Sequence, residues 1–168
     1  MKDVHSQEIA KLCAEFNVQG GFIDNEPSIS SAAKLARNSG LLLADQKDKL
    51  TEDFREITVV DGGEEFPAYG IKYRKWCKNI FSLFALNKYS INPIYQWQEY
   101  SQTNPLSIYR HLTGVAWEPE EGIVERDSSK IDDLYFALMF AEAAFSLYLT
   151  NPSIVAYAGN NTEWWSHW

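Results

Sequence analysis

The sequence has little cysteine. Cys13 and Cys77 are the two cysteines among 168 residues, and they form no CxxC pair. A chain of this length buries roughly 70% of its unfolded surface around one core, so it needs no disulfide or structural metal. We therefore expect two free thiols in a reducing cytosol, with a disulfide between them as the alternative.

Long apolar runs are also lacking. Charged and polar side chains interrupt residues 1–13, which excludes the continuous apolar core of a signal peptide. The most apolar stretch, 134–149, spans 16 residues and contains Glu142, whereas a membrane-spanning helix needs roughly 20 apolar residues. These features predict a cytoplasmic protein that makes no contact with a membrane.

Catalytic and metal-binding motifs are missing as well. The sequence contains no GxxxxGKS/T, GxGxxG or GxSxG segment, which argues against the common nucleotide-binding and acyl-transfer sites. Its histidines, His5, His111 and His167, lack the HxxxH or HxH spacing of metal ligands. Nothing in the sequence brings Cys77 and His111 together as nucleophile and base. We expect no enzymatic activity, no metal and no cofactor.

Negative charge is abundant and unevenly distributed. The chain carries 15 Lys and Arg against 23 Asp and Glu, a formal net charge of −8. Residues 113–168 hold nine acidic and two basic side chains, whereas residues 71–112 hold one acidic and six basic ones. In a compact domain these sets either neutralise one another or form separate faces that steer charged partners.

Most of the chain has helical periodicity. Apolar residues recur every three or four positions in 4–16 and 71–87, and 129–149 is apolar nearly all round. A further helix is expected from Ser28 or Ser30 to about residue 43, with a break near Gly40. Asn-Pro pairs at 92–93 and 104–105 predict two short helices. No linker or repeat divides the chain, so we predict one globular domain over 1–168.

β-structure is expected to be minor. Residues 54–60 are rich in β-branched side chains and precede an Asp-Gly-Gly turn signal at 61–63, which predicts a hairpin with 64–70 as its second arm. Pro67 cannot donate to a ladder and therefore places that arm at a sheet edge. Residues 115–126 are expected to form a loop or a second small hairpin. The predicted fold class is mainly α (α+β), a single-domain helical fold with a minor β-hairpin.

Glu142 is the most informative single residue. It shares a helical stripe with apolar residues of 129–149, and a carboxylate buried there needs a cation or a hydrogen-bond donor. Arg74, Lys78, Arg110 or a tyrosine hydroxyl could supply one. We interpret this candidate buried carboxylate either as a general acid or base in a pocket, or as a structural group in an ion pair or at an edge that reaches water.

Two segments combine acidic and aromatic side chains. Five carboxylates follow Trp117 within 117–127, and three tryptophans occur in 164–168. Exposed tryptophans form costly apolar surface, so we expect these rings to dock on the chain's own core, on a partner or on a second copy of the chain. Carboxylates beside aromatic anchors suit a basic protein surface. The predicted partner-binding residues are Glu118, Glu120, Glu121, Glu125, Asp127, Trp164, Trp165 and Trp168.

These observations predict a non-enzymatic acidic protein-binding module, an inhibitor or immunity-type protein such as an antitoxin that neutralises a basic enzyme or toxin. One alternative is a small helical enzyme with a pocket around Glu142. The other is a nucleic-acid-associated protein that uses the basic segment 72–78. Phosphates would be repelled by a net charge of −8 unless the basic surface were segregated, so nucleic acid is not the expected partner.

Overall fold

The structure is a computed structural model that describes residues 4–47, 49–89, 108–112, 115–118, 123–126 and 133–151. The chain divides into two compact units. The first unit comprises Met1–Lys72 and Ala143–Trp168, and the second unit comprises Tyr73–Glu142. The prediction of one globular domain stays a prediction, and each unit is described by itself.

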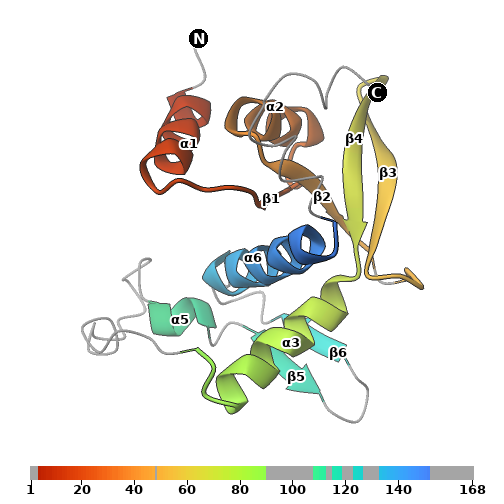
Figure 1. Cartoon of the computed structure of the whole chain (residues 1–168). Helices are drawn as coiled ribbons and strands as arrows, with labels where there is room; N and C mark the ends of the chain where they lie inside the picture. The colour runs from red at the N-terminus through yellow and green to blue at the C-terminus, as the bar shows by residue number, and fades with distance from the viewer. Residues whose placement is uncertain are drawn as a thin grey trace. The chain divides into compact units, whose positions relative to one another are not determined.

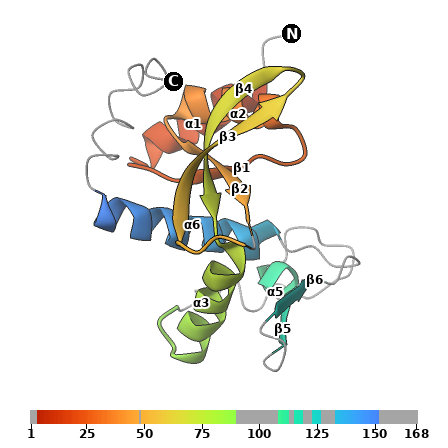
Figure 2. The same ribbon diagram turned by 90° about the vertical axis from the view of Figure 1, so that its right-hand side faces the viewer.

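The first unit is built on a four-stranded mixed sheet in the order β1-β2-β4-β3 (Figures 1 and 2). Strands β1, β2 and β4 are parallel, and β3 pairs antiparallel with β4. The fold class is therefore α/β, and the prediction of a mainly helical fold with a minor hairpin is wrong. The strands are β1 (Phe22–Asp24), β2 (Leu42–Gln46), β3 (Phe54–Asp61) and β4 (Glu64–Ile71).

The helix that was expected to reach about residue 43 ends earlier and gives way to β2. Helix α2 spans Ile29–Ser39, and Gly40 closes it in the left-handed conformation, with φ of 72° and its N–H donated to Ala36 O. Residues Leu42–Ala44 are all buried, as is typical of a parallel strand covered on both faces. Such a strand shows no alternation of apolar and polar residues, so its sequence resembles a buried helix.

The structure has the long hairpin that the Asp-Gly-Gly signal predicts. Strands β3 and β4 pair from Phe54 opposite Ile71 to Asp61 opposite Glu64. The prediction that Pro67 marks an edge strand is wrong, because β4 lies between β2 and β3. The ladder between β2 and β4 begins only at Tyr69, so the missing N–H of Pro67 precedes it and costs no bond there.

Helix α2 covers one face of the sheet. Three alanines of α2 let it approach the strands closely, and α1 (Val4–Glu15) lies beside α2. On the opposite face the Phe22 ring lies 6.3 Å from Phe54 and 6.1 Å from Tyr69, measured between ring centroids. Figures 1 and 2 show the second half of α6 on that side. The core under α2 consists of Ala32, Ala33, Ala36, Leu43, Val59, Phe66 and Ala68.

Helix α6 spans Asp133–Thr150 and is apolar along most of its length. Phe145 and Leu149 nevertheless leave 62% and 65% of their surface exposed. Among the described residues α6 is the one helix long and apolar enough to cross a membrane, a test that core helices also pass. The absence of membrane contact stays a prediction. The buried residues of α6 are Tyr135, Phe136, Met139, Phe140, Ala143, Ala144 and Leu147.

The second unit contains α3 (Tyr73–Ala85), α5 (Ile108–Leu112), β5 (Val115–Glu118), β6 (Ile123–Arg126) and the first half of α6. Helix α3 matches the amphipathic segment expected at 71–87, and β5 with β6 is the small hairpin expected as one alternative at 115–126. The Tyr135 hydroxyl donates to Cys77 O at 2.6 Å and joins α6 to α3. Both Cys77 and Cys13 are free thiols.

Candidate functional site

The acidic segment is organised by the β5–β6 hairpin of the second unit. Ala116 lies opposite Glu125, and Glu118 lies opposite Ile123. Because residues on one strand alternate between faces, this register assigns positions 118 and 125 to the same face of the ribbon. Glu118 is exposed, whereas Val115 at the start of β5 is buried with 6% of its surface exposed.

The hairpin is attached to the second unit along β6 and at the start of β5, whereas Glu118 at the end of β5 is exposed. Strand β6 lies beside α3, and Val115 anchors β5. The four-residue connection between the strands carries Glu120 and Glu121. These two residues lie outside the described part of the chain, as do Asp127, Trp164, Trp165 and Trp168.

Glu142 is half-buried and has a tyrosine as its hydrogen-bond partner. The Tyr89 hydroxyl donates to Glu142 Oε1 at 2.5 Å. Burial and this carboxylate both raise the pKa of Tyr89, because each disfavours the phenolate. The tyrosine hydroxyl was one of the donors considered from the sequence, and the structure places it on Glu142. The side chain of Arg110, another of those donors, lies outside the described part of the chain.

The stripe of α6 that contains Glu142 is buried at its start, where Tyr135 is 1% exposed, and becomes exposed towards the end of the helix. Glu142 shares this side with Phe145, which is 62% exposed, and Leu149, which is 65% exposed. Met139, three residues before Glu142 and therefore on the same face, is 0% exposed, so Glu142 lies where the buried part of the stripe gives way to the exposed part. Glu142 therefore reaches water at an edge, and its single hydrogen bond suffices where a buried charge would need full compensation.

A small cavity of about 210 Å³ adjoins Glu142 and is lined by Asn79, Ser82 and Leu83 of α3. Pockets that hold small ligands usually measure about 300–1,000 Å³. The cavity is therefore small for a substrate site. His111 lies elsewhere in the unit and accepts a hydrogen bond from Leu134 N at 3.4 Å through Nδ1, which caps the start of α6.

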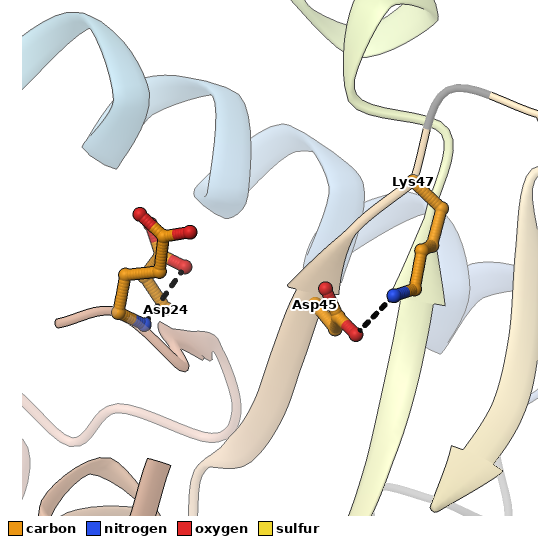
Figure 3. A network of polar contacts seen from close by, with 4 residues as sticks. Asp24, Asp45 and Lys47 are labelled. Carbon is orange, nitrogen blue, oxygen red and sulfur yellow. Dashed lines mark hydrogen bonds and ion pairs between the residues drawn. The ribbon is translucent and has the colours of Figure 1, made fainter. Parts of the chain in front are cut away.

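A polar network that the sequence analysis missed lies where β1 and β2 of the first unit end (Figure 3). Gln46 Nε2 donates to Asp24 Oδ2 at 2.8 Å, and Lys47 Nζ lies 2.6 Å from Asp45 Oδ2. Carboxyl ends of parallel strands are where α/β sheets bind ligands. The sequence signal is a pair of apolar segments that each end in Asp, but it becomes visible only once β1 and β2 are recognised as strands.

The acidic side chains of the described residues do not form a metal centre. No group of three or more His, Cys, Asp or Glu side chains is placed to hold a metal ion within the described ranges. The expectation that the protein needs no metal or cofactor stays a prediction.

Comparisons with known proteins give no independent indication of function. No protein-family model matches the chain, and no curated protein or solved structure matches it.

Proposed function

We propose that the protein is a non-enzymatic acidic binding module of the inhibitor or immunity type, which covers a basic surface on an enzyme or toxin. The observation that carries the proposal is the β5–β6 hairpin, whose register assigns positions 118 and 125 to one face and whose Glu118 is exposed. Its connection adds Glu120 and Glu121. A hairpin segment whose sequence carries four carboxylates is suited to meet lysine and arginine side chains.

The charge of the whole chain supports the same partner. The net charge of −8 attracts a basic protein over distances up to the Debye length, about 8 Å at physiological ionic strength. Exposed carboxylates at the rim of an interface mainly raise the association rate, while buried aromatic anchors supply most of the affinity. In this proposal Trp164, Trp165 and Trp168 provide the anchors.

The test begins with native mass spectrometry of the chain purified from its source cells. A basic protein recovered in stoichiometric complex would then be used as the analyte in binding kinetics. We expect Glu118→Lys to lower the association rate about tenfold at low salt, and to lower it less as salt is raised. Recovery of the chain without any basic companion would contradict the proposal.

Glu15→Lys is the matched control, because Glu15 is an exposed carboxylate at the end of α1 in the first unit. It changes the net charge by the same amount as Glu118→Lys. An equal effect of both variants would show that only total charge matters and would contradict the hairpin as the contact surface. Loss of affinity in a Trp164→Ala variant, mainly through faster dissociation, would identify an anchor.

A second candidate, a small enzyme centred on Glu142, is favoured by the short hydrogen bond from Tyr89 beside a cavity. A catalytic Glu142 predicts that Glu142→Gln loses turnover while the melting temperature is unchanged or raised. A structural pair predicts instead that Glu142→Gln and Tyr89→Phe each cost about 0.5–1.5 kcal/mol of unfolding free energy. The half-exposed carboxylate and the small cavity favour the structural pair, which equal losses in thermal melts would support.

A further inference from the structure

We propose that the first unit binds a small organic phosphate monoester in a cationic groove next to the carboxyl ends of β2 and β4. This goes beyond the acidic hairpin, which belongs to the second unit. The groove has a volume of about 470 Å³, within the range of about 300–1,000 Å³ that is usual for small-molecule pockets. Its lining residues are Gln46, Lys47, Lys49, Leu50, Arg55 and Ile57.

The register of the sheet explains why the face is hollow at this point. Asp45 of β2 and Arg55 of β3 both lie opposite Gly70 of β4. One row across three strands therefore has no side chain at its centre. On the same face, two residues earlier along β4, Ala68 is covered by the core under α2. Helix α2 therefore packs over β4 as far as Ala68, and the groove begins at the next residue on the same face, Gly70.

Aliphatic parts of the lining residues surround Gly70. A Cβ atom at position 70 would lie 3.4 Å from Leu50 Cδ1 and 3.5 Å from both Ile57 Cδ1 and Lys47 Cγ. These side chains can lie close to the β4 backbone because Gly70 has none of its own. They form an apolar floor that suits the organic part of a ligand, while the lysine head group remains in water.

The described lining residues contribute three cations, and the carboxylates of Asp45 and Glu52 pair with two of them. Asp48, between Lys47 and Lys49, lies outside the described residues. Lys49 is exposed and makes no ion pair among the described residues. Lys47 reaches back to Asp45 (Figure 3), and Arg55 Nε lies 2.5 Å from Glu52 Oε1, with 57% and 51% of those side chains exposed. Exposed ion pairs contribute about 0–1 kcal/mol, so an incoming anion can displace Glu52 from Arg55.

A phosphate monoester fits this arrangement better than other anions. It carries a charge of about −1.5 to −2 at neutral pH and offers oxygens in the geometry that the guanidinium fork of Arg55 binds through two hydrogen bonds. A carboxylate ligand carries one negative charge, so it is less able than a phosphate to displace Glu52 from Arg55 while also facing Lys49. A nucleic-acid strand would place many phosphates against a chain with a net charge of −8.

The direct test is a titration of the full chain with phenyl phosphate, followed by amide chemical shifts in NMR. We expect saturable shifts at Leu50, Arg55 and Gly70. Phenol lacks the charge and inorganic phosphate lacks the apolar body, so each should bind about tenfold more weakly. Benzoate binding as tightly as phenyl phosphate would overturn the assignment of the phosphate, and the absence of saturable shifts in this region would overturn the site.

Two variants and one control separate the charge from the apolar floor. Lys49→Gln should weaken phenyl phosphate binding about fivefold, whereas Lys34→Gln, an exposed lysine on α2, should leave it within about twofold. Leu50→Ser should weaken phenyl phosphate but not inorganic phosphate. Equal affinities for Lys49→Gln and Lys34→Gln would overturn the proposal, provided that thermal melts show both variants folded.

Discussion

Gly20 gives the sharpest test of how the second half of α6 is held in the first unit. A Cβ atom at Gly20 would overlap the ring and the hydroxyl oxygen of Tyr148. The same hydroxyl accepts a hydrogen bond from Gly21 N at 3.2 Å. Burial raises the pKa of Tyr148, although this hydrogen bond lowers it. Tyr148 thus occupies the space that a side chain at position 20 would need.

We expect Gly20→Ala to lower the free energy of unfolding by about 2 kcal/mol. Gly20 does not have a left-handed φ, so alanine alone would gain about 0.4–1 kcal/mol through the unfolded state. An extra methyl group in a packed site costs about 1–3 kcal/mol. Moving Tyr148 aside also removes the partner of Gly21 N–H, a loss of about 1 kcal/mol. The two costs together exceed the gain.

The assay is a double-mutant cycle in urea, followed by tryptophan fluorescence and circular dichroism. In a Tyr148→Ala background the overlap is absent, so Gly20→Ala should be neutral or slightly stabilising. Residues in contact couple by about 0.5–3 kcal/mol, whereas independent sites add within about 0.5 kcal/mol. Equal effects of Gly20→Ala in both backgrounds would refute the contact between Gly20 and Tyr148, and with it this attachment of α6.

Three further predictions concern local features. Burial and the hydrogen bond to Cys77 O raise the pKa of Tyr135 above its usual 10.0. The folded state therefore retains a proton that the unfolded chain releases, and the free energy of unfolding falls as the pH rises above about 10. Tyr135→Phe should reduce this loss of stability at alkaline pH, as measured in urea melts at several pH values. Ser28 accepts from Ser31 N at the start of α2, and Ser28→Ala should cost about 1 kcal/mol in a urea melt, whereas no loss would exclude it as a cap. Gly40→Ala puts a residue with a Cβ atom into a left-handed backbone conformation, with φ of 72°, and should lower the free energy of unfolding by about 1–2 kcal/mol. An unchanged melting temperature would contradict the left-handed cap.

Elements with strong local signals could be predicted from the sequence. The Asp-Gly-Gly turn at 61–63 allows positive φ, which both Gly62 and Gly63 adopt, and the amphipathic stripe of α3 buries Trp76, Cys77 and Ile80 as its periodicity indicates. These signals come from backbone freedom and side-chain spacing within a few residues. No distant partner is needed to produce them.

The parallel strands could not be predicted in the same way. Strand β1 has three residues, and β2 consists of Leu-Leu-Ala followed by two polar residues. Leucine and alanine favour helices intrinsically, so the strand state of 42–46 depends on pairing with β1 and β4. Missing β2 changed the predicted fold class, because the hairpin then had no sheet to join.

The burial of Glu142 was inferred from apolar neighbours on its stripe, and that inference assumed that an apolar stripe is a buried one. That assumption holds for Tyr135, which is 1% exposed on the same stripe, and fails for Phe145 and Leu149, which are mostly exposed. A helix that is apolar all round gives no sequence signal for which side meets water. The choice depends on what packs against it, and only the three-dimensional arrangement supplies that information.

The net charge of the chain also gives no information about the local charge of one surface. A total of −8 predicts attraction to basic partners, yet the described lining of the groove contributes three cations, of which Lys47 and Arg55 are paired with Asp45 and Glu52. In the sequence nothing distinguishes Lys47 and Lys49 from other lysines, or Gly70 from the rest of the nine glycines. These residues come together in the fold because the pairing of β4 places Gly70 opposite Asp45 and Arg55. Because Coulomb interactions in salt solution are screened beyond about 8–10 Å, a ligand in the groove responds mainly to the charges around it, which include Asp45 and Glu52 as well as the three cations. Under the two proposals, the acidic chain binds an anion through the first unit and presents carboxylates to a basic protein through the second.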